Sequence, residues 1–163
     1  GLLIPAGPLR EKIESLKKYD AVFLKNDNND NTLEFEKLIK KINQNIKIFY
    51  TNFEIRNLDQ FDISQKYLIF SGIGCPENFR KILLKNKFNI VDEIIYPDHF
   101  DYNRNIIDNI KDRAKKLDAK IITTEKDFVK LPENFKKKIN FLEIELIITE
   151  EQRLKHFLND KFN

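Results

Sequence analysis

The run Tyr67-Leu68-Ile69-Phe70-Ser71-Gly72-Ile73-Gly74-Cys75-Pro76 sets the architecture that the rest of the chain follows. The four consecutive apolar residues at its start are typical of a strand that is buried on both faces of a parallel sheet. The two glycines suit a tight turn, and Pro76 is favoured as the first residue of a helix. The run therefore predicts a strand that leads directly into a crossover helix.

Two strand–helix–strand units follow from this start. The first joins the helix after Pro76 to a strand over residues 90–96. The second joins a helix that begins after Asp101 or Asn103 to a strand over residues 120–123. Apolar residues recur at helical spacing in both helices. This alternation predicts an open, mostly parallel α/β sheet with flanking helices, of the Rossmann-like class, in which ligands bind beyond the carboxyl ends of the strands.

The segments on both sides of these units predict further elements. A helical pattern that starts at Pro8, followed by a short strand over residues 21–24, indicates the last helix and strand of a preceding domain. The other predicted elements are a helix over residues 31–42, strands over 46–51 and 140–148, a short strand near 53–55, and a C-terminal helix.

The composition is that of an ordinary globular protein, with 41% apolar and 34% charged residues among 163. No apolar run approaches the roughly 20 residues that a membrane-spanning helix needs. The net charge of +3 is too small to predict nucleic-acid binding. The single cysteine, Cys75, excludes an internal disulfide and agrees with a reducing compartment. Because the chain contains no methionine, we expect it to be a fragment whose N-terminal half is missing.

Three polar loops follow the carboxyl ends of predicted strands, at residues 71–76, 97–102 and 123–127. These ends share one edge of a parallel sheet, which raises the expectation of a ligand site there. In the second loop, Asp98 precedes His99, one of two histidines in the chain. An imidazole titrates near neutrality, so a histidine beside a carboxylate can hold or pass a proton. The alternative, which the local pattern alone favours, is a histidine that is merely a polar loop residue.

Other motifs each have two interpretations. Thr123-Thr124-Glu125-Lys126-Asp127 is either a salt-bridged turn or part of a site, because it gathers hydroxyls and charges at a strand end. Arg10-Glu11 is either a surface pair or a clamp in which the arginine faces phosphate and the glutamate a metal ion. Gly72-Ile73-Gly74 does not complete the dinucleotide fingerprint, because Glu77 replaces its third glycine. The phosphate-cradling pattern GxxxxGK(S/T) is absent from the sequence.

Five motifs occur in a fixed order along the chain: LIPAGPLRE at residues 3–11, DAV at 20–22, FSGIG at 70–74, PDH at 97–99 and TTEKD at 123–127. Together they resemble the tetraacyldisaccharide 4′-kinases of lipid A synthesis, and the resemblance covers the whole chain as the C-terminal half of that family. It implies transfer of the ATP γ-phosphate to the 4′-hydroxyl of a tetraacyldisaccharide 1-phosphate, with Mg²⁺. ATP and Mg²⁺ would bind mainly through the missing N-terminal half, since this chain lacks the family's P-loop.

The resemblance also implies roles for single residues. His99, with Asp98 beside it, would assist a catalytic aspartate from the missing half in removing the hydroxyl proton. Arg10 would face phosphate, and Glu11 would face the Mg²⁺ environment. The positions that would support the same cleft are Tyr102, Thr123, Thr124, Glu125, Lys126 and Asp127.

The same resemblance implies a domain plan and a location. Residues 1–30 would be the tail of a P-loop kinase domain, residues 31–148 a small α/β domain, and residues 149–163 a C-terminal helix. A two-stranded linker, at about residues 46–51 and 140–148, would tether the small domain. The implied partners are the lipid A precursor and the inner-membrane surface, with no nucleic acid, and the implied location is peripheral, on the cytoplasmic face of that membrane.

Two other functions are compatible with these residues. A non-enzymatic α/β ligand-binding module, or an inactive truncated relative, is favoured by the absent P-loop. A different glycosyl or phosphosugar enzyme would use Asp98 and His99 alone as its acid and base.

Overall fold

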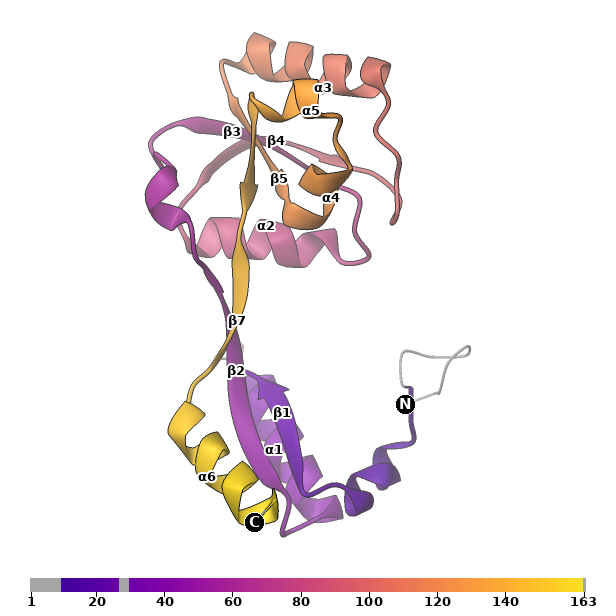
Figure 1. Ribbon diagram of the computed structural model, residues 1–163, viewed down its shortest axis with the longest axis vertical. Coiled ribbons are helices and arrows are strands. Elements are labelled where there is room, and N and C mark those ends of the chain that lie inside the picture. The colour runs from indigo at the N-terminus through magenta and orange to yellow at the C-terminus, as the bar shows by residue number, and fades with distance from the viewer. Residues whose placement is uncertain (1–9, 27–29, 163) are drawn as a thin grey trace. The chain divides into compact units, whose positions relative to one another are not determined.

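The computed structural model describes residues 10–26 and 30–162. The loop predicted over residues 1–8 therefore lies outside the described residues. The chain forms two compact units (Figure 1). The first unit contains the residues up to Phe53 and from Leu146 onward, and the second contains Glu54–Glu145.

The second unit holds a four-stranded sheet in which each strand is parallel to its neighbours. Its strands are β3 (Lys66–Ser71), β4 (Asn89–Ile95), β5 (Lys120–Thr124) and β6 (Ile139–Leu142). Their spatial order is β4-β3-β5-β6, so β3 lies inside the sheet and has a neighbour on both sides. This confirms the predicted parallel α/β sheet, and it brings the carboxyl ends of β3, β4 and β5 to one edge.

Helices cover both faces of this sheet, with α2 (Pro76–Lys85) on one face and α3 (Arg104–Leu117) on the other (Figure 1). Side chains of β3 alternate between the two faces. Phe70 belongs to the core on the α3 side, and Ile69 belongs to the core on the α2 side. Both side chains are fully buried, which explains why the strand is apolar at every position rather than at alternate ones.

The start of α3 is fixed by Asn103, whose side-chain oxygen accepts a hydrogen bond from the backbone N–H of Ile106 at 3.1 Å. Of the two predicted caps, Asp101 and Asn103, the structure therefore selects the second. Three shorter helices complete the second unit, namely η2 (Leu58–Gln60), α4 (Glu125–Lys130) and α5 (Glu133–Lys136).

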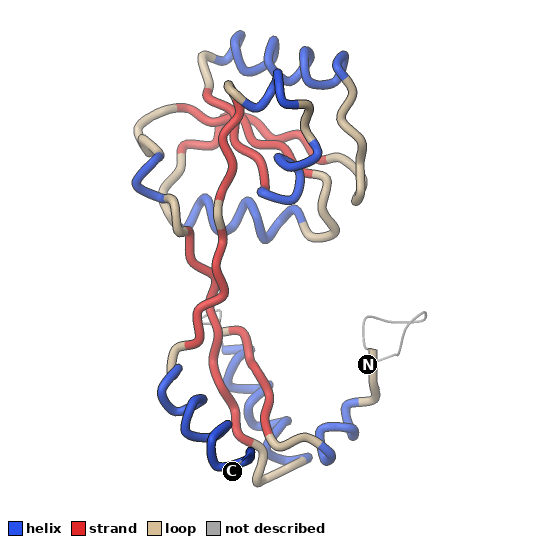
Figure 2. The backbone as a smooth tube through the Cα atoms, viewed as in Figure 1, coloured by secondary structure: helices blue, strands red, loops and turns tan. Residues whose placement is uncertain are grey.

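The other sheet has three strands in the order β1-β2-β7, and its strands β2 and β7 begin or end in the first unit and extend into the second. It consists of β1 (Ala21–Lys25), β2 (Lys47–Ile55) and β7 (Ile144–Ile148), with β1 parallel to β2. The backbone N–H of Thr149 donates to the carbonyl of Tyr50, whereas that of Arg56 donates to the carbonyl of Glu143, so β7 runs antiparallel to β2. Figure 2 shows both segments as strands. The helices of the first unit are η1 (Ile13–Lys18), α1 (Asp30–Ile42) and α6 (Glu151–Phe162).

Two sequence predictions about strands were wrong. The expected pair of strands near residues 46–51 and 53–55 is the single strand β2. The strand expected over residues 140–148 is divided at Glu143, so that β6 joins the parallel sheet and β7 pairs with β2. The buried side chain of Asn57 stabilises the break, because its amide donates to the carbonyl of Phe141 at 2.9 Å and accepts from the N–H of Glu143 at 3.0 Å.

Helix α1 belongs to the first unit, whereas the sequence predicts a domain boundary near residue 31. The identity of the two parts as a kinase tail and a small domain stays a prediction. None of the helices in the described ranges is long and apolar enough to cross a membrane.

Candidate functional site

Three segments that follow β3, β4 and β5 meet at the carboxyl edge of the parallel sheet, in the second unit. The third, predicted as a loop over residues 123–127, is instead the end of β5 and the first turn of α4. The backbone N–H of Gly72, after β3, donates to Oδ2 of Asp127, after β5, at 2.9 Å. A Cβ atom added at Gly72 would lie 2.9 Å from the hydroxyl of Tyr102, in the loop after β4, and 3.2 Å from Oδ1 of Asp127. The structure thus brings together residues from all three loops that the sequence analysis selected.

The first turn of α4 explains the Thr-Thr-Glu-Lys-Asp motif. The hydroxyl of Thr124 accepts a hydrogen bond from the backbone N–H of Asp127 at 3.1 Å and donates to its carboxylate at 2.7 Å. The first of these bonds caps the N-terminus of α4, and the second ties the carboxylate of Asp127 to the cap residue. Thr123 donates to the carbonyl of Phe70 at 2.8 Å and so joins β5 to β3. The motif is therefore a buried brace, while the side chains of Glu125 and Lys126 face outward.

The carboxylate of Asp127 is completely buried, with an exposed fraction of 0%. Besides Gly72 and Thr124, it has the ammonium of Lys130 at 3.4 Å as a partner. A buried carboxylate with two hydrogen-bond donors and one cation is well compensated. Sequence reasoning missed Lys130, which lies one helical turn after Asp127, at the spacing of a helical ion pair.

Aromatic rings hold the loop after β4. The rings of Tyr96 and Phe100 stack with a centroid distance of 4.4 Å, and the ring of Tyr102 meets both of them edge-on. The hydroxyl of Tyr102 is buried and has no hydrogen-bond partner among the described residues. Burial raises the pKa of Tyr102, and the nearby carboxylate of Asp127 raises it further. Tyr102 therefore stays neutral, and its ring packs between the loop after β4 and Gly72.

Asp98 and His99 lie at the surface of this cluster. The ammonium of Lys126 donates to Oδ1 of Asp98 at 2.9 Å, and this contact holds the pKa of Asp98 below its usual value. Oδ2 of Asp98 lies 3.8 Å from Nε2 of His99. The side chain of His99 is 78% exposed, and its backbone has a φ of 61°, a strained conformation for a residue with a side chain. The loop thus presents an imidazole to solvent beside a carboxylate that stays ionised.

Chemically, this arrangement suits proton transfer to or from a molecule that approaches from outside the sheet edge. It does not by itself form a metal site, because the described residues contain no group of three or more histidine, cysteine, aspartate or glutamate side chains that could hold an ion. The chain also contains no phosphate-cradling loop. The described residues at this sheet edge therefore offer no cluster of ligands for Mg²⁺.

Arg10 and Glu11 belong to the first unit. The carboxylate of Glu11 accepts hydrogen bonds from the hydroxyl of Tyr19 at 3.0 and 2.9 Å, which lowers the pKa of Glu11. Both side chains are exposed. The structure therefore shows a local partner for Glu11 and leaves the predicted roles of the pair untested.

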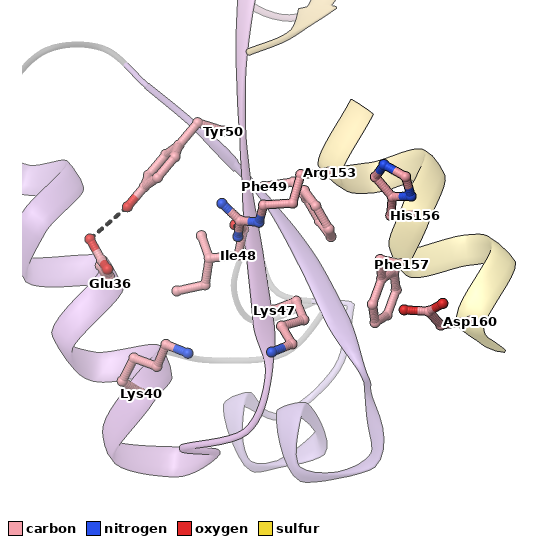
Figure 3. A pocket seen from close by; sticks show the side chains of 10 residues that line it. All are labelled: Glu36, Lys40, Lys47, Ile48, Phe49, Tyr50, Arg153, His156, Phe157 and Asp160. Atoms are coloured by element: carbon pink, nitrogen blue, oxygen red, sulfur yellow. Dashed lines mark hydrogen bonds between the residues drawn. The ribbon is translucent and has the colours of Figure 1, made fainter. Parts of the chain in front are cut away.

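A separate pocket of about 610 Å³ lies in the first unit, between α1, β2 and α6 (Figure 3). The guanidinium of Arg153 donates to the carbonyl of Ile48 at 2.7 Å and lies over the ring of Phe49 at 4.9 Å. The hydroxyl of Tyr50 donates to Glu36 at 2.6 Å, which raises the pKa of Tyr50 to about 12. These contacts join the strand to both helices and so hold this unit together.

Comparison with known proteins supports the resemblance. The family model described as tetraacyldisaccharide-1-P 4'-kinase matches residues 1–163. The tetraacyldisaccharide 4'-kinase of Pelagibacter ubique is 44% identical over 154 residues, which cover 94% of this chain and 49% of that protein. The enzyme of the same name from Rickettsia canadensis is 37% identical over 163 residues, which cover 99% of this chain and 46% of that protein.

A solved structure shows the same fold. The "apo" form of LpxK from Aquifex aeolicus, in complex with ATP, matches with a TM-score of 0.57 at 20% identity, over 99% of this chain and 48% of that one. The chain thus spans about half the length of the relatives that it matches. With a family model that matches it from end to end, the chain belongs to the tetraacyldisaccharide-1-P 4'-kinase family.

Proposed function

We propose that this chain acts as part of a kinase that phosphorylates the 4′-hydroxyl of tetraacyldisaccharide 1-phosphate in lipid A biosynthesis. The observation that carries the proposal is the pair of Asp98 and His99, held by Lys126 at the sheet edge of a chain that belongs to this family. Bound ATP with Mg²⁺ would supply the phosphoryl group, and a P-loop domain outside this chain would hold both.

The exposed imidazole of His99 is the group that would take part in moving the proton of the acceptor hydroxyl. As that oxygen attacks the γ-phosphorus, its proton passes to a base, which we propose is a catalytic aspartate outside this chain assisted by His99. The carboxylate of Asp98 lies 3.8 Å from the ring, on the same loop. Phosphoryl transfer depends mainly on positioning and charge, so a rigid loop matters as much as the imidazole itself.

The remaining predicted residues have supporting roles in this proposal. Tyr102, Thr123, Thr124 and Asp127 fix the three loops, while Lys126 holds Asp98. Glu125, on the exposed first turn of α4, would face the same cleft. Arg10 and Glu11 would face phosphate and Mg²⁺ at the edge of the kinase domain.

The proposed substrate and family also lead to a proposed location and domain plan. A tetraacylated disaccharide lies in a lipid phase, so we propose a peripheral location on the cytoplasmic face of the inner membrane, with no nucleic-acid partner. In the proposed domain plan, residues 1–30 end the kinase domain, and the paired strands β2 and β7 link it to the parallel sheet.

The test starts with the N-terminal sequence and intact mass of the native protein, because activity needs a phosphate-binding loop. Kinase assays would then compare His99→Ala with His156→Ala, a matched control at the chain's other histidine, which lies exposed on α6. Loss of an assisting acid–base group should lower kcat by about 10²- to 10⁴-fold. His156→Ala should retain the wild-type rate. Full activity of His99→Ala would overturn the assigned role.

A second function, a non-enzymatic lipid-binding module, is favoured by the absence of a phosphate-cradling loop from this sequence. It predicts that the native chain begins close to Gly1 and binds the lipid disaccharide without turnover. Calorimetric titration with the lipid, with and without ATP and Mg²⁺, distinguishes the two functions. Phosphorylated product excludes the module.

A further inference from the structure

The histidine at the sheet edge has a backbone conformation that few residues with a side chain adopt. His99 is the third residue of a four-residue turn, which the N–H of Phe100 closes by donating to the carbonyl of Pro97 at 3.2 Å. Its φ is 61°, in the left-handed region. In a turn with a positive φ at this position, glycine or asparagine is the usual residue. A histidine is retained there only where neighbouring contacts stabilise the conformation.

The carboxylate of Asp98 supplies such a contact. Its Oδ1 accepts a hydrogen bond from the backbone N–H of His99 at 2.9 Å. Its Oδ2, by contrast, lies 3.8 Å from Nε2 of the imidazole, beyond hydrogen-bond distance. The carboxylate is therefore bonded to the backbone of His99 and not to its ring, which leaves the exposed ring free to meet a molecule from outside.

Lys126 fixes this carboxylate from another segment of the chain. Its ammonium donates to the same Oδ1 of Asp98 at 2.9 Å, across 28 residues of sequence. Lys126 lies in the first turn of α4, next to Asp127, whose buried carboxylate binds the N–H of Gly72 at 2.9 Å. The lysine is thus carried by a turn that is itself bonded to the loop after β3, and its ammonium determines where the carboxylate of Asp98 lies.

The pair of Lys126 and Asp98 is too exposed to contribute much to folding. Their side chains are 44% and 43% exposed, and ion pairs at such positions add little to the free energy of unfolding. Geometry at a reacting group matters far more, because a displacement of about 1 Å can lower a catalytic rate about 10²-fold. The pair is therefore better suited to placing a side chain than to stabilising the fold.

We infer that Lys126 is a positioning residue, which acts through the carboxylate of Asp98 to hold the imidazole of His99 where it meets the acceptor hydroxyl. Asp98 then has no acid–base role of its own. The inference rests on the proposed function, in which His99 assists the removal of the proton from that hydroxyl. The other role open to Lys126 is direct contact with a phosphate of the substrate. Its bond to Asp98 favours positioning, because that carboxylate would compete with a phosphate for the ammonium.

Steady-state kinase assays of the protein at its full natural length distinguish the two roles of Lys126. Lys126→Gln should lower kcat about 10- to 100-fold at an unchanged KM, because the imidazole is misplaced. Lys126→Arg keeps a cation and a donor, so it should recover most of the rate. Lys155→Gln, at another exposed lysine that is paired with a carboxylate, is the control and should have wild-type kinetics. A raised KM at unchanged kcat in Lys126→Gln would show contact with the substrate and would overturn the inference.

Substitutions of Asp98 test whether its carboxylate serves the backbone. Asp98→Asn keeps an oxygen that can accept from the N–H of His99, so it should retain most of the wild-type kcat and the same pH dependence of kcat/KM. Asp98→Ala should lose as much kcat as Lys126→Gln, and combining the two should cause no further loss. A shifted pH profile in Asp98→Asn, or a loss equal to that in Asp98→Ala, would show that the carboxylate acts on the ring and would overturn the inference.

Hydrogen exchange of the His99 amide, followed by NMR, needs neither ATP nor turnover. This amide should exchange faster in Lys126→Gln and Asp98→Ala than in the wild type, and close to the wild-type rate in Asp98→Asn and Lys155→Gln. The midpoint of urea unfolding should stay close to that of the wild type in every variant. Equal exchange in all of them, or a large loss of stability in Lys126→Gln, would overturn the inference. In a protein without kinase activity the exchange rates still decide whether Lys126 holds the backbone of His99, so a failure of the proposed function and a failure of this inference are distinguishable.

Discussion

The backbone N–H of Gly72 donates a hydrogen bond to the buried carboxylate of Asp127 at 2.9 Å, across 55 residues of sequence. This bond joins the turn after β3 to the first turn of α4. Tyr102 lies over the same glycine, so the three loops of the sheet edge are held through one small residue and one carboxylate.

Gly72→Ala should destabilise the protein, because the new Cβ would lie 2.9 Å from the hydroxyl of Tyr102 and 3.2 Å from Oδ1 of Asp127. The expected cost is about 1–3 kcal/mol, typical of overpacking a tight site. Gly74→Ala is the matched control, since its Cβ would meet only Oδ2 of Asp98, at an ordinary 3.5 Å. Urea denaturation of both variants measures the difference. Adding Tyr102→Phe to Gly72→Ala should recover part of the loss, and equal stability of the two glycine variants would disprove the crowding.

Asp127→Ala should be more damaging, since it leaves the N–H of Gly72, the hydroxyl of Thr124 and the ammonium of Lys130 without their shared partner. Losing a buried, hydrogen-bonded carboxylate costs about 3 kcal/mol or more. Asp59→Ala, at an exposed aspartate in the same unit, is the control and should have little effect. Thermal or urea unfolding followed by circular dichroism gives the comparison. If Asp127→Ala left the free energy of unfolding almost unchanged, the hydrogen bonds of Asp127 would not be what holds these segments together.

Lys126→Gln should raise the pKa of Asp98, because the hydrogen bond from Lys126 is the main cause of its lowered value. In the wild type the folded-state pKa lies below the unfolded value, so this contribution to stability is present above the ordinary titration range of aspartate. It is lost as the pH falls through the folded-state pKa. Carbon-13 NMR titration of the Asp98 carboxyl follows the shift directly. Lys81→Gln should leave this titration unchanged, and an identical titration in Lys126→Gln would contradict the pairing.

Asn57→Ala should destabilise the junction between β6 and β7. The buried amide of Asn57 pairs with the backbone of Phe141 and of Glu143, and alanine would leave both groups unsatisfied. The expected loss is about 2 kcal/mol. Asn78→Ala, at an exposed position of α2, provides the control. Hydrogen exchange should show faster opening at Glu143 in the Asn57 variant, and unchanged exchange there would show that the break has another cause.

The sequence by itself determined the elements whose signals are local. The apolar run of β3, the proline at the start of α2 and the cap at Asn103 each act within a few residues, and the alternation of strands and helices then requires a parallel sheet. Because parallel strands share a carboxyl edge, the sequence also placed the loop with Asp98 and His99 at the same edge as Asp127, although Asp127 lies on a helical turn and not on the predicted loop.

Only the tertiary structure decided the contacts between segments far apart in the chain. Residues 140–148 alternate between apolar and polar, and this pattern is the same for one continuous strand and for two strands in different sheets. The break at Glu143 depends on a hydrogen bond to Asn57, which is far away in the sequence. Lys126 could pair with any nearby carboxylate, and the meeting of two loops selects Asp98. Lysines 111, 115, 120, 137 and 138 are ordinary surface residues in the sequence, and they line one groove only because α3 ends, and β5 and β6 begin, at the same edge of the sheet. Local patterns fix which elements form, whereas packing over long separations in sequence fixes which side chains meet.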